Sequence, residues 1–315
     1  MLVINIHAPI VIPEGRIELL TFSRCAVPFF FIVNGYFLYR SDSEAFDQTI
    51  QHRIHKNMLF TGKGLVVYFI INVFAAVATH GFTELVHRMA NPLNLFYFLV
   101  LNWTTPYFGV GHLWYLFALL YALVLLKYTM RFIKPHLLPI SIILLCVTYS
   151  LECVNFFTSH QILDLWYRNS LLLALPCIAL GYWCAQHKEK LMKSFELGNL
   201  VLLFFVAWIF FKFEYRVLGD HFYIYIHSVL FALGALLLAL KYPNLFSEKT
   251  FLVRIGERYT HDIYMWHYVP LILLIDFQIS IKYEFSFAVF VMAIWIALKC
   301  GIQKVRSRTR QTVQK

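Results

Sequence analysis

The chain has 315 residues, of which 60% are hydrophobic, 18% aromatic and only 14% charged. A soluble protein of this length needs about a quarter of its residues charged, so the composition excludes an ordinary soluble domain. The formal net charge of +10 does not indicate nucleic-acid binding, because the Lys and Arg residues gather in short segments between apolar stretches, which is a membrane-topology signal.

Apolar blocks of roughly 17 to 22 residues follow one another in series, about the length of helix that crosses ~30 Å of hydrocarbon. Lipid offers the backbone no hydrogen-bond partners, so each block should be helical. The predicted spans are residues 17–39, 58–79, 111–127, 137–154, 168–185, 197–213, 223–240, 259–279 and 286–302. We predict an all-α polytopic membrane protein with about nine complete transmembrane helices, forming a single domain over residues 1–315 in a lipid bilayer.

Two further apolar segments are too short to cross a membrane. Residues 91–103 are expected to be interfacial or re-entrant. Residues 1–13 open in mid-helix, without the positive leader of a signal peptide. We therefore expect that the natural start lies upstream, or that this is a shortened form with a truncated first helix.

The basic residues predict the orientation. Twenty of the 27 Lys and Arg residues fall on the side that holds the loop after residue 39 and the C-terminal tail, and six fall on the other side. Positive residues favour the cytoplasmic face. The C-terminus is therefore predicted to be cytoplasmic.

Ionisable and polar side chains inside apolar spans are costly, and they usually face a cavity or a partner. Those that stand out are His7, Arg24, Asn34, His112, Glu152, His227, Asp262 and His267. Each also has a structural interpretation, since a lone histidine in an apolar helix is more often an interhelical contact than a catalyst.

Four segments, in order, resemble the acyltransferase 3 family of integral-membrane acyltransferases. They read VINIHAP (residues 3–9), SRCAVPFFFIVNGYFLY (23–39), HLWYLFALL (112–120) and ERYTHDIYMWHYVPLILL (257–274). Members of this family O-acetylate bacterial surface polysaccharides and related glycans, so the resemblance implies a protein of the bacterial inner membrane. In the family an arginine precedes the catalytic histidine by roughly ten residues on the same helix. Here that position falls before Met1, so the resemblance implies that a form starting at Met1 lacks one of the cations of the acyl-donor site and, with it, full activity.

The resemblance gives His7 the role of general base, which suits histidine because its side chain takes and returns a proton near neutral pH. Arg53, His55 and Lys56 form a basic cluster at the predicted cytoplasmic entrance, where they would grip the phosphates of acyl-CoA. Their other interpretation is that they serve only the topology. The resemblance implies acyl-CoA as a co-substrate and no bound cofactor. No metal site is predicted, because no acidic or cysteine partner lies at zinc spacing from the histidines.

The remaining candidate residues would position the acceptor or the acyl carbonyl: Arg24, Asn34, His112 and His267. The leading function is transfer of an acyl group, acetyl first among them, from cytosolic acyl-CoA to a hydroxyl of a cell-surface polysaccharide or its lipid-linked precursor. The alternative is a polysaccharide or lipid transporter, flippase or polymerase, because these proteins are also polytopic and carry intramembrane Arg and His.

Overall fold

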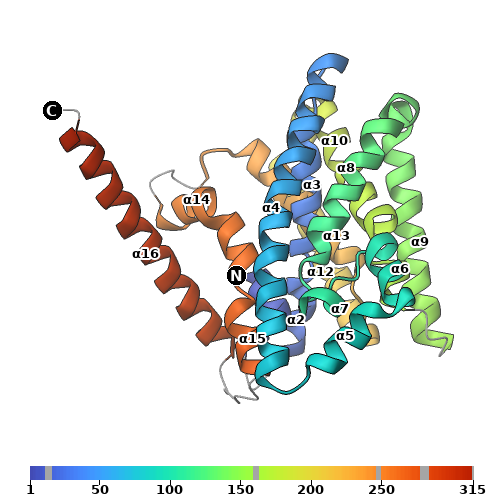
Figure 1. Ribbon diagram of the computed structural model, residues 1–315. Helices are drawn as coiled ribbons and strands as arrows, with labels where there is room; N and C mark the ends of the chain where they lie inside the picture. Colours follow the sequence, from blue (N-terminus) through green and yellow to red (C-terminus); the bar gives the residue numbers. More distant parts are fainter. Residues whose placement is uncertain (11–15, 159–162, 246–249, 277–283, 314–315) are drawn as a thin grey trace. The chain divides into compact units, whose positions relative to one another are not determined.

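The computed structural model describes residues 1–10, 16–158, 163–245, 250–276 and 284–313. Within these ranges the regular structure is helical, which confirms the all-α class (Figure 1). The helices fall into two units. The terminal unit comprises Met1–Arg16 with Phe246–Lys315, and the central unit comprises Ile17–Leu245. The prediction of a single domain over residues 1–315 stays a prediction.

The central unit contains most of the helices. Its α-helices are α2 (Arg16–Ser23), α3 (Ala26–Leu38), α4 (Ser43–Ala78), α5 (Phe82–Ala90), α6 (Pro92–Leu101), α7 (Thr105–Phe108), α8 (Trp114–Ile133), α9 (Leu137–Thr158), α10 (Leu175–Gln186), α11 (Lys188–Ser194), α12 (Leu197–Leu218) and α13 (Ile226–Lys241). Three short segments of other helical type join them, namely η1 (Lys134–His136), η2 (Asp164–Trp166) and the π-helical η3 (Ser170–Ala174).

The centre of this unit is a close crossing of α3 and α10. A Cβ atom added to Gly35 would lie 1.9 Å from the carbonyl oxygen of Ile178, and one added to Gly181 would lie 1.9 Å from that of Ile32. Only glycine allows two helix backbones to approach so closely. The two glycines therefore fix the position of α10 against α3.

A proline interrupts the helix that the sequence predicts over residues 17–39, although Ile17–Leu38 still counts as one stretch long and apolar enough to cross a membrane. Pro28 has no N–H to donate to the carbonyl of Arg24 four residues earlier, and its ring crowds that carbonyl. The chain accordingly turns at Arg24 and Cys25, between α2 and α3. The break places the side chain of Arg24 at a turn rather than in the middle of a regular helix.

Two buried carboxylates hold the loop between α12 and α13. Glu152 on α9 accepts hydrogen bonds from the backbone N–H groups of Tyr223 (3.0 Å) and Ile224 (3.2 Å). Glu214 on α12 accepts from the N–H of Ile226 (2.8 Å) and lies 2.8 Å from Nδ1 of His227. Hydrogen bonds of this kind satisfy backbone N–H groups, for which lipid offers no acceptor. Glu152 and His227, found as intramembrane polar residues in the sequence, are therefore part of the loop's support.

The terminal unit contains α1 (Leu2–His7), α14 (Phe251–Trp266), α15 (Val269–Asp276) and α16 (Glu284–Val313). Its core joins the two ends of the chain, since Ile4 and Ala8 pack with Leu271 of α15 and Ala288 of α16. A second proline shapes this unit: Pro270 cannot donate to the carbonyl of Trp266, and α14 ends there.

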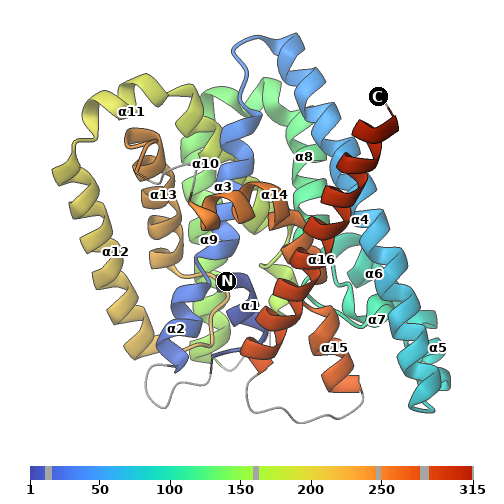
Figure 2. The ribbon, with the colours of Figure 1, turned by 90° about the vertical axis from the view of Figure 1, so that its left-hand side faces the viewer.

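Five described helical stretches are long and apolar enough to cross a membrane, or six when α10 and α11, which meet at a bend of 78°, form one span. Figure 2 shows α11 turning away from the end of α10. The predicted count of about nine is not confirmed. The stretch Trp114–Thr158 counts once because η1 joins α8 to α9 without a gap, although the chain reverses there (Figure 1). The 16 residues of α13 reach only ~24 Å, against ~30 Å of hydrocarbon.

The predicted span 259–279 also differs from the structure. It divides into α14 and α15, and residues 277–279 lie outside the described residues. The first of these helices carries four charged residues, Arg254, Glu257, Arg258 and Asp262. An amphipathic helix of this kind suits a membrane interface better than the hydrocarbon core.

Candidate functional site

The residue predicted to be the general base, His7, ends α1 in the terminal unit. Pro9 follows two residues later, and a residue before a proline is driven away from helical geometry. The side-chain oxygen of Asn5 accepts from the N–H of Ile10 at 2.9 Å and so closes the turn. His7 is half-buried and lies at the point where the helix stops.

The structure brings His7 together with His267, a second residue predicted to lie at the site. Their ring centroids are 5.4 Å apart and their planes are tilted by 39°. Tyr268 presents an edge to His7 with the centroids 5.3 Å apart. Residues from the two ends of the sequence thus form one histidine pair within the terminal unit.

The break between α14 and α15 determines the tautomer of His267. Its Nδ1 lies 2.8 Å from the carbonyl oxygen of Tyr264 and 3.1 Å from that of Ile263. A carbonyl oxygen only accepts, so Nδ1 carries the hydrogen and Nε2 is the basic nitrogen of the neutral ring. The His267 ring is fully buried, and two carbonyl groups fix its orientation beside His7.

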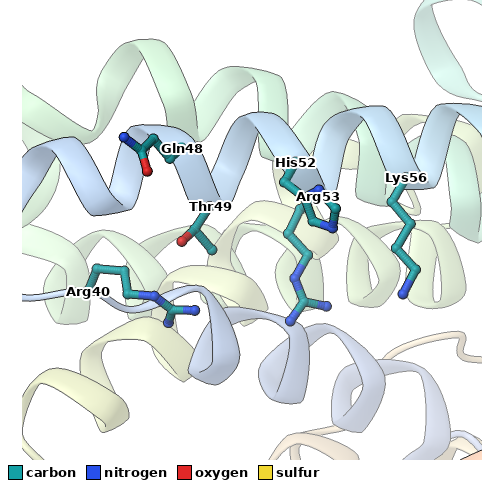
Figure 3. Close-up of a pocket in the computed structure, with 6 residues that line it drawn as sticks. All are labelled: Arg40, Gln48, Thr49, His52, Arg53 and Lys56. Carbon is teal, nitrogen blue, oxygen red and sulfur yellow. The ribbon is translucent and has the colours of Figure 1, made fainter.

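The second candidate region is a basic pocket at one end of the central unit. Its volume is about 390 Å³, and its lining residues are Arg40, Gln48, Thr49, His52, Arg53 and Lys56. Figure 3 shows Arg53 and Lys56 extending from α4 on the same side, with Arg40 coming from the segment before α4. The arrangement gathers three permanent cations around a cavity that would accept a phosphate group.

Local sequence explains how this pocket forms. The carboxylate of Asp42 caps α4 by accepting from the N–H of Ala45 at 2.7 Å. Residues four apart on the helix then share a face, which aligns His52 with Lys56. His55 is exposed and lies outside the lining residues, so the structure brings together only two members of the predicted cluster.

A neighbouring pocket of about 450 Å³ shares Arg40 with the first. Three basic residues of α8 and of the turn after it, Lys127, Arg131 and Lys134, line it together with acidic and aromatic residues from the start of α4 and from α10. The two pockets extend the basic surface of this end of the central unit beyond the predicted cluster.

The other predicted residues of the central unit each have contacts of their own. The amide nitrogen of Asn34 donates to the carbonyl of Phe30 at 2.8 Å and lies 3.3 Å from the hydroxyl of Tyr115. His112 is buried, with its ring edge-on to Tyr68 at 5.1 Å. Asn34 thus joins α3 to α8, and His112 packs from the turn before α8 against α4.

Arg24 has a different environment. Its guanidinium lies 4.9 Å from the ring centroid of Tyr223, and the guanidinium of Arg168 lies 4.3 Å from the same centroid. The sequence did not identify Arg168 or Tyr223, nor the hydrogen bonds by which Glu214 holds the loop between α12 and α13. Contacts made by a loop leave no helical periodicity in the sequence. The one available signal was the charge of Arg168 and Glu214 at the edges of apolar spans.

Within the described ranges, no group of three or more His, Cys, Asp or Glu side chains is placed to hold a metal ion. The model of the acyltransferase 3 family, described as an acyltransferase domain, matches residues 1–301 of the chain. No curated protein and no solved structure matches this chain. The family match runs through both units and includes all the candidate residues above.

Proposed function

This chain belongs to the acyltransferase 3 family of membrane acyltransferases, and we propose that it moves an acyl group, acetyl in the first place, from cytosolic acyl-CoA to a hydroxyl of a cell-surface polysaccharide or its lipid-linked precursor. The observation that carries the proposal is the family match, which extends from residue 1 to residue 301. The histidine pair and the basic pocket support it with chemistry of the required kind.

His7 is the proposed base. As the acceptor hydroxyl attacks the thioester carbonyl, its proton passes to the imidazole of His7, and a C–O bond forms. The tetrahedral oxyanion then collapses, the C–S bond breaks, and the leaving thiolate takes the proton back from His7. A positioned base of this kind contributes roughly 10²–10⁴-fold to the rate. His267 acts as a positioning residue, since its ring lies 5.4 Å from that of His7 and is held by two carbonyl groups.

The basic pocket is the proposed binding site for the phosphates of the donor. Arg53 and Lys56 supply charge-assisted hydrogen bonds, and Arg40 adds a third cation. In the proposed orientation this end of the central unit faces the cytoplasm of a bacterial cell, where acyl-CoA is made, and the C-terminus lies on the same side of the inner membrane. The bias of basic residues toward that side supports the orientation.

Replacing Arg53 and Lys56 together with Ala should raise the KM for acyl-CoA about 10-fold or more, because each lost charge-assisted bond is worth roughly 1.5–3 kcal/mol. The phosphates of the donor lie far from the reacting thioester. The ground state and the transition state should therefore lose the same binding free energy, and kcat should stay unchanged. Initial rates at varied acyl-CoA, with saturating acceptor, measure both constants.

The matched control is Lys63→Ala, an exposed cation two turns further along α4 that is not among the lining residues. His55→Ala should likewise leave the KM for the donor near its original value, since His55 lies outside the lining. An unchanged KM in the double variant would assign Arg53 and Lys56 to membrane topology alone.

A further inference from the structure

Two arginines of the central unit converge on one aromatic ring at the loop between α12 and α13. The guanidinium of Arg24 lies 4.9 Å from the centroid of Tyr223, and that of Arg168 lies 4.3 Å from it and 5.1 Å from the centroid of Trp114. Two guanidinium groups gathered at one ring repel each other, and this costs free energy unless an anion joins them. Tyr223 and Trp114 are half-buried.

Arg24 makes neither an ion pair nor a hydrogen bond in the part of the chain that the structure describes; its guanidinium lies against the Tyr223 ring, and its Nε is buried. A guanidinium has five N–H donors, and an unpaired charge at membrane depth is expensive. Glu152 is a nearby acid, but its two oxygens accept from the backbone of Tyr223 and Ile224. The donors of Arg24 therefore lack an acceptor among the described residues.

Arg168 is only partly compensated. One of its terminal nitrogens pairs with Asp164 at 2.9 Å, and its side chain is 19% exposed. Within the described residues its Nε, like that of Arg24, is buried and without a hydrogen-bond partner. The two guanidinium groups together thus present several unused donors around one ring.

The surroundings hold this arrangement rigidly. The Tyr225 hydroxyl donates to the carbonyl of Gly219 at 2.8 Å and accepts from the N–H of Phe222 at 3.1 Å, which closes the loop that carries Tyr223. Gly219 itself has a φ of +61°, which favours glycine at that position. Beside Arg168, the side chain of Asn169 accepts from two N–H groups of η3. A site held by its supporting contacts before any ligand arrives is preorganised.

We propose that Arg24 and Arg168 form a binding site for an oxyanion, a phosphate or carboxylate carried by the glycan acceptor, with Tyr223 and Trp114 as the aromatic surface beside the sugar. The proposed site specifies that the acceptor is an anionic glycan, and it rests on the proposed function. Planar guanidinium groups bind such oxyanions through paired hydrogen bonds. The donor pocket at the start of α4 is separate, because none of its lining residues belongs to this cluster.

The test uses the full chain in lipid nanodiscs, without any acyl donor, and measures the shift of the thermal unfolding midpoint with added ligand. Glucose 1-phosphate, glucuronate and glucose are the probes, with inorganic phosphate as a fourth. A ligand that binds only the folded state raises the midpoint with its concentration. We expect stabilisation by glucose 1-phosphate or by glucuronate, and none by glucose; the two anionic sugars distinguish a phosphate from a carboxylate.

Arg24→Gln and Arg168→Gln should each raise the apparent Kd for the anionic sugar at least about 10-fold, since a charge-assisted contact is removed. The control is Arg216→Gln, an exposed arginine in the last turn of α12, which should keep the Kd. The unfolding midpoint of each variant without ligand distinguishes a binding role from a structural one. Removing an unpaired buried charge should leave this midpoint unchanged or raise it, whereas loss of a structural contact should lower it.

Equal stabilisation by glucose and the anionic sugars, or by none of them, would overturn the site. So would an anion response that persists in both variants, or stabilisation by inorganic phosphate alone, which would show a site with no preference for a sugar. Because no acyl donor is present, the result is independent of transfer. If the chain binds the anionic sugar but transfers no acyl group, the anion site is supported and the proposed function is wrong.

Discussion

Replacing His7 with Ala is expected to reduce acyl transfer about 10²–10⁴-fold, the usual cost of removing a positioned general base. The loss should appear in kcat, because the base acts only as the hydroxyl proton moves in the transition state. His7 ends α1 and is half-buried, so the helices should stay folded. Transfer rates and the thermal unfolding midpoint, measured on the same preparation, give the two quantities.

His7→Gln separates a catalytic role from a structural one. Glutamine keeps a hydrogen-bonding side chain of similar reach but does not titrate. If His7 is a base, the Gln variant is as inactive as the Ala variant; if it is only an interhelical contact, Gln preserves transfer. His136→Ala, at an exposed histidine of η1, is the control and should behave as the original chain. A fully active His7→Gln protein would refute the mechanism.

Gly181→Ala should cause the largest loss of folded protein. The new Cβ would lie 1.9 Å from the carbonyl oxygen of Ile32 and 2.9 Å from the N atom of Tyr36, and both are backbone atoms that cannot rotate away. The helices must separate, and α3 carries the contacts of Asn34 with it. Overpacking typically costs about 1–3 kcal/mol, and a backbone clash lies at or above the upper end of that range. Equilibrium unfolding in a denaturing detergent measures the change.

Alanine at glycines with open space around them is the control, because there the change in stability should have the opposite sign. Gly62 and Gly198 lie in helices α4 and α12 with nothing within 4 Å of an added Cβ. Alanine at either position should stabilise the protein by up to about 1 kcal/mol, because alanine favours helix over glycine. Gly35→Ala should behave as Gly181→Ala does, with Ile178 as the clashing residue. If all four variants had the same stability, α3 and α10 would not cross as closely as described.

The sequence allowed the helical class and the positions of most apolar segments to be predicted, because both follow from composition and block length. The number of spans did not follow, since hydropathy does not show where proline ends a helix or where a helix is too short to cross the hydrocarbon. Pro270 ends α14, and α13 has only 16 residues. Counting apolar residues also treats α14 as part of a span, although its charged face makes it amphipathic.

The candidate site was predictable where residue type alone carries the chemistry. His7 and His267 were each identified from their segments, but their proximity at 5.4 Å requires the fold of the terminal unit. Arg53 and Lys56 were identified by charge, whereas Arg40, which completes the pocket, precedes the helix cap at Asp42. The cluster around Tyr223 depends on a loop held by Glu152, and long-range contacts of this kind leave no periodic pattern.

Transfer of radiolabel from acetyl-CoA, measured in membranes that contain the protein, tests the proposed function most directly. We expect label in the polysaccharide or lipid-linked glycan fraction, released as acetate by mild alkali because the new bond is an oxygen ester. The label should be lost when His7 is replaced by Gln. Label that remains with the donor, or that reaches the glycan equally in membranes lacking the protein, would contradict the proposed function.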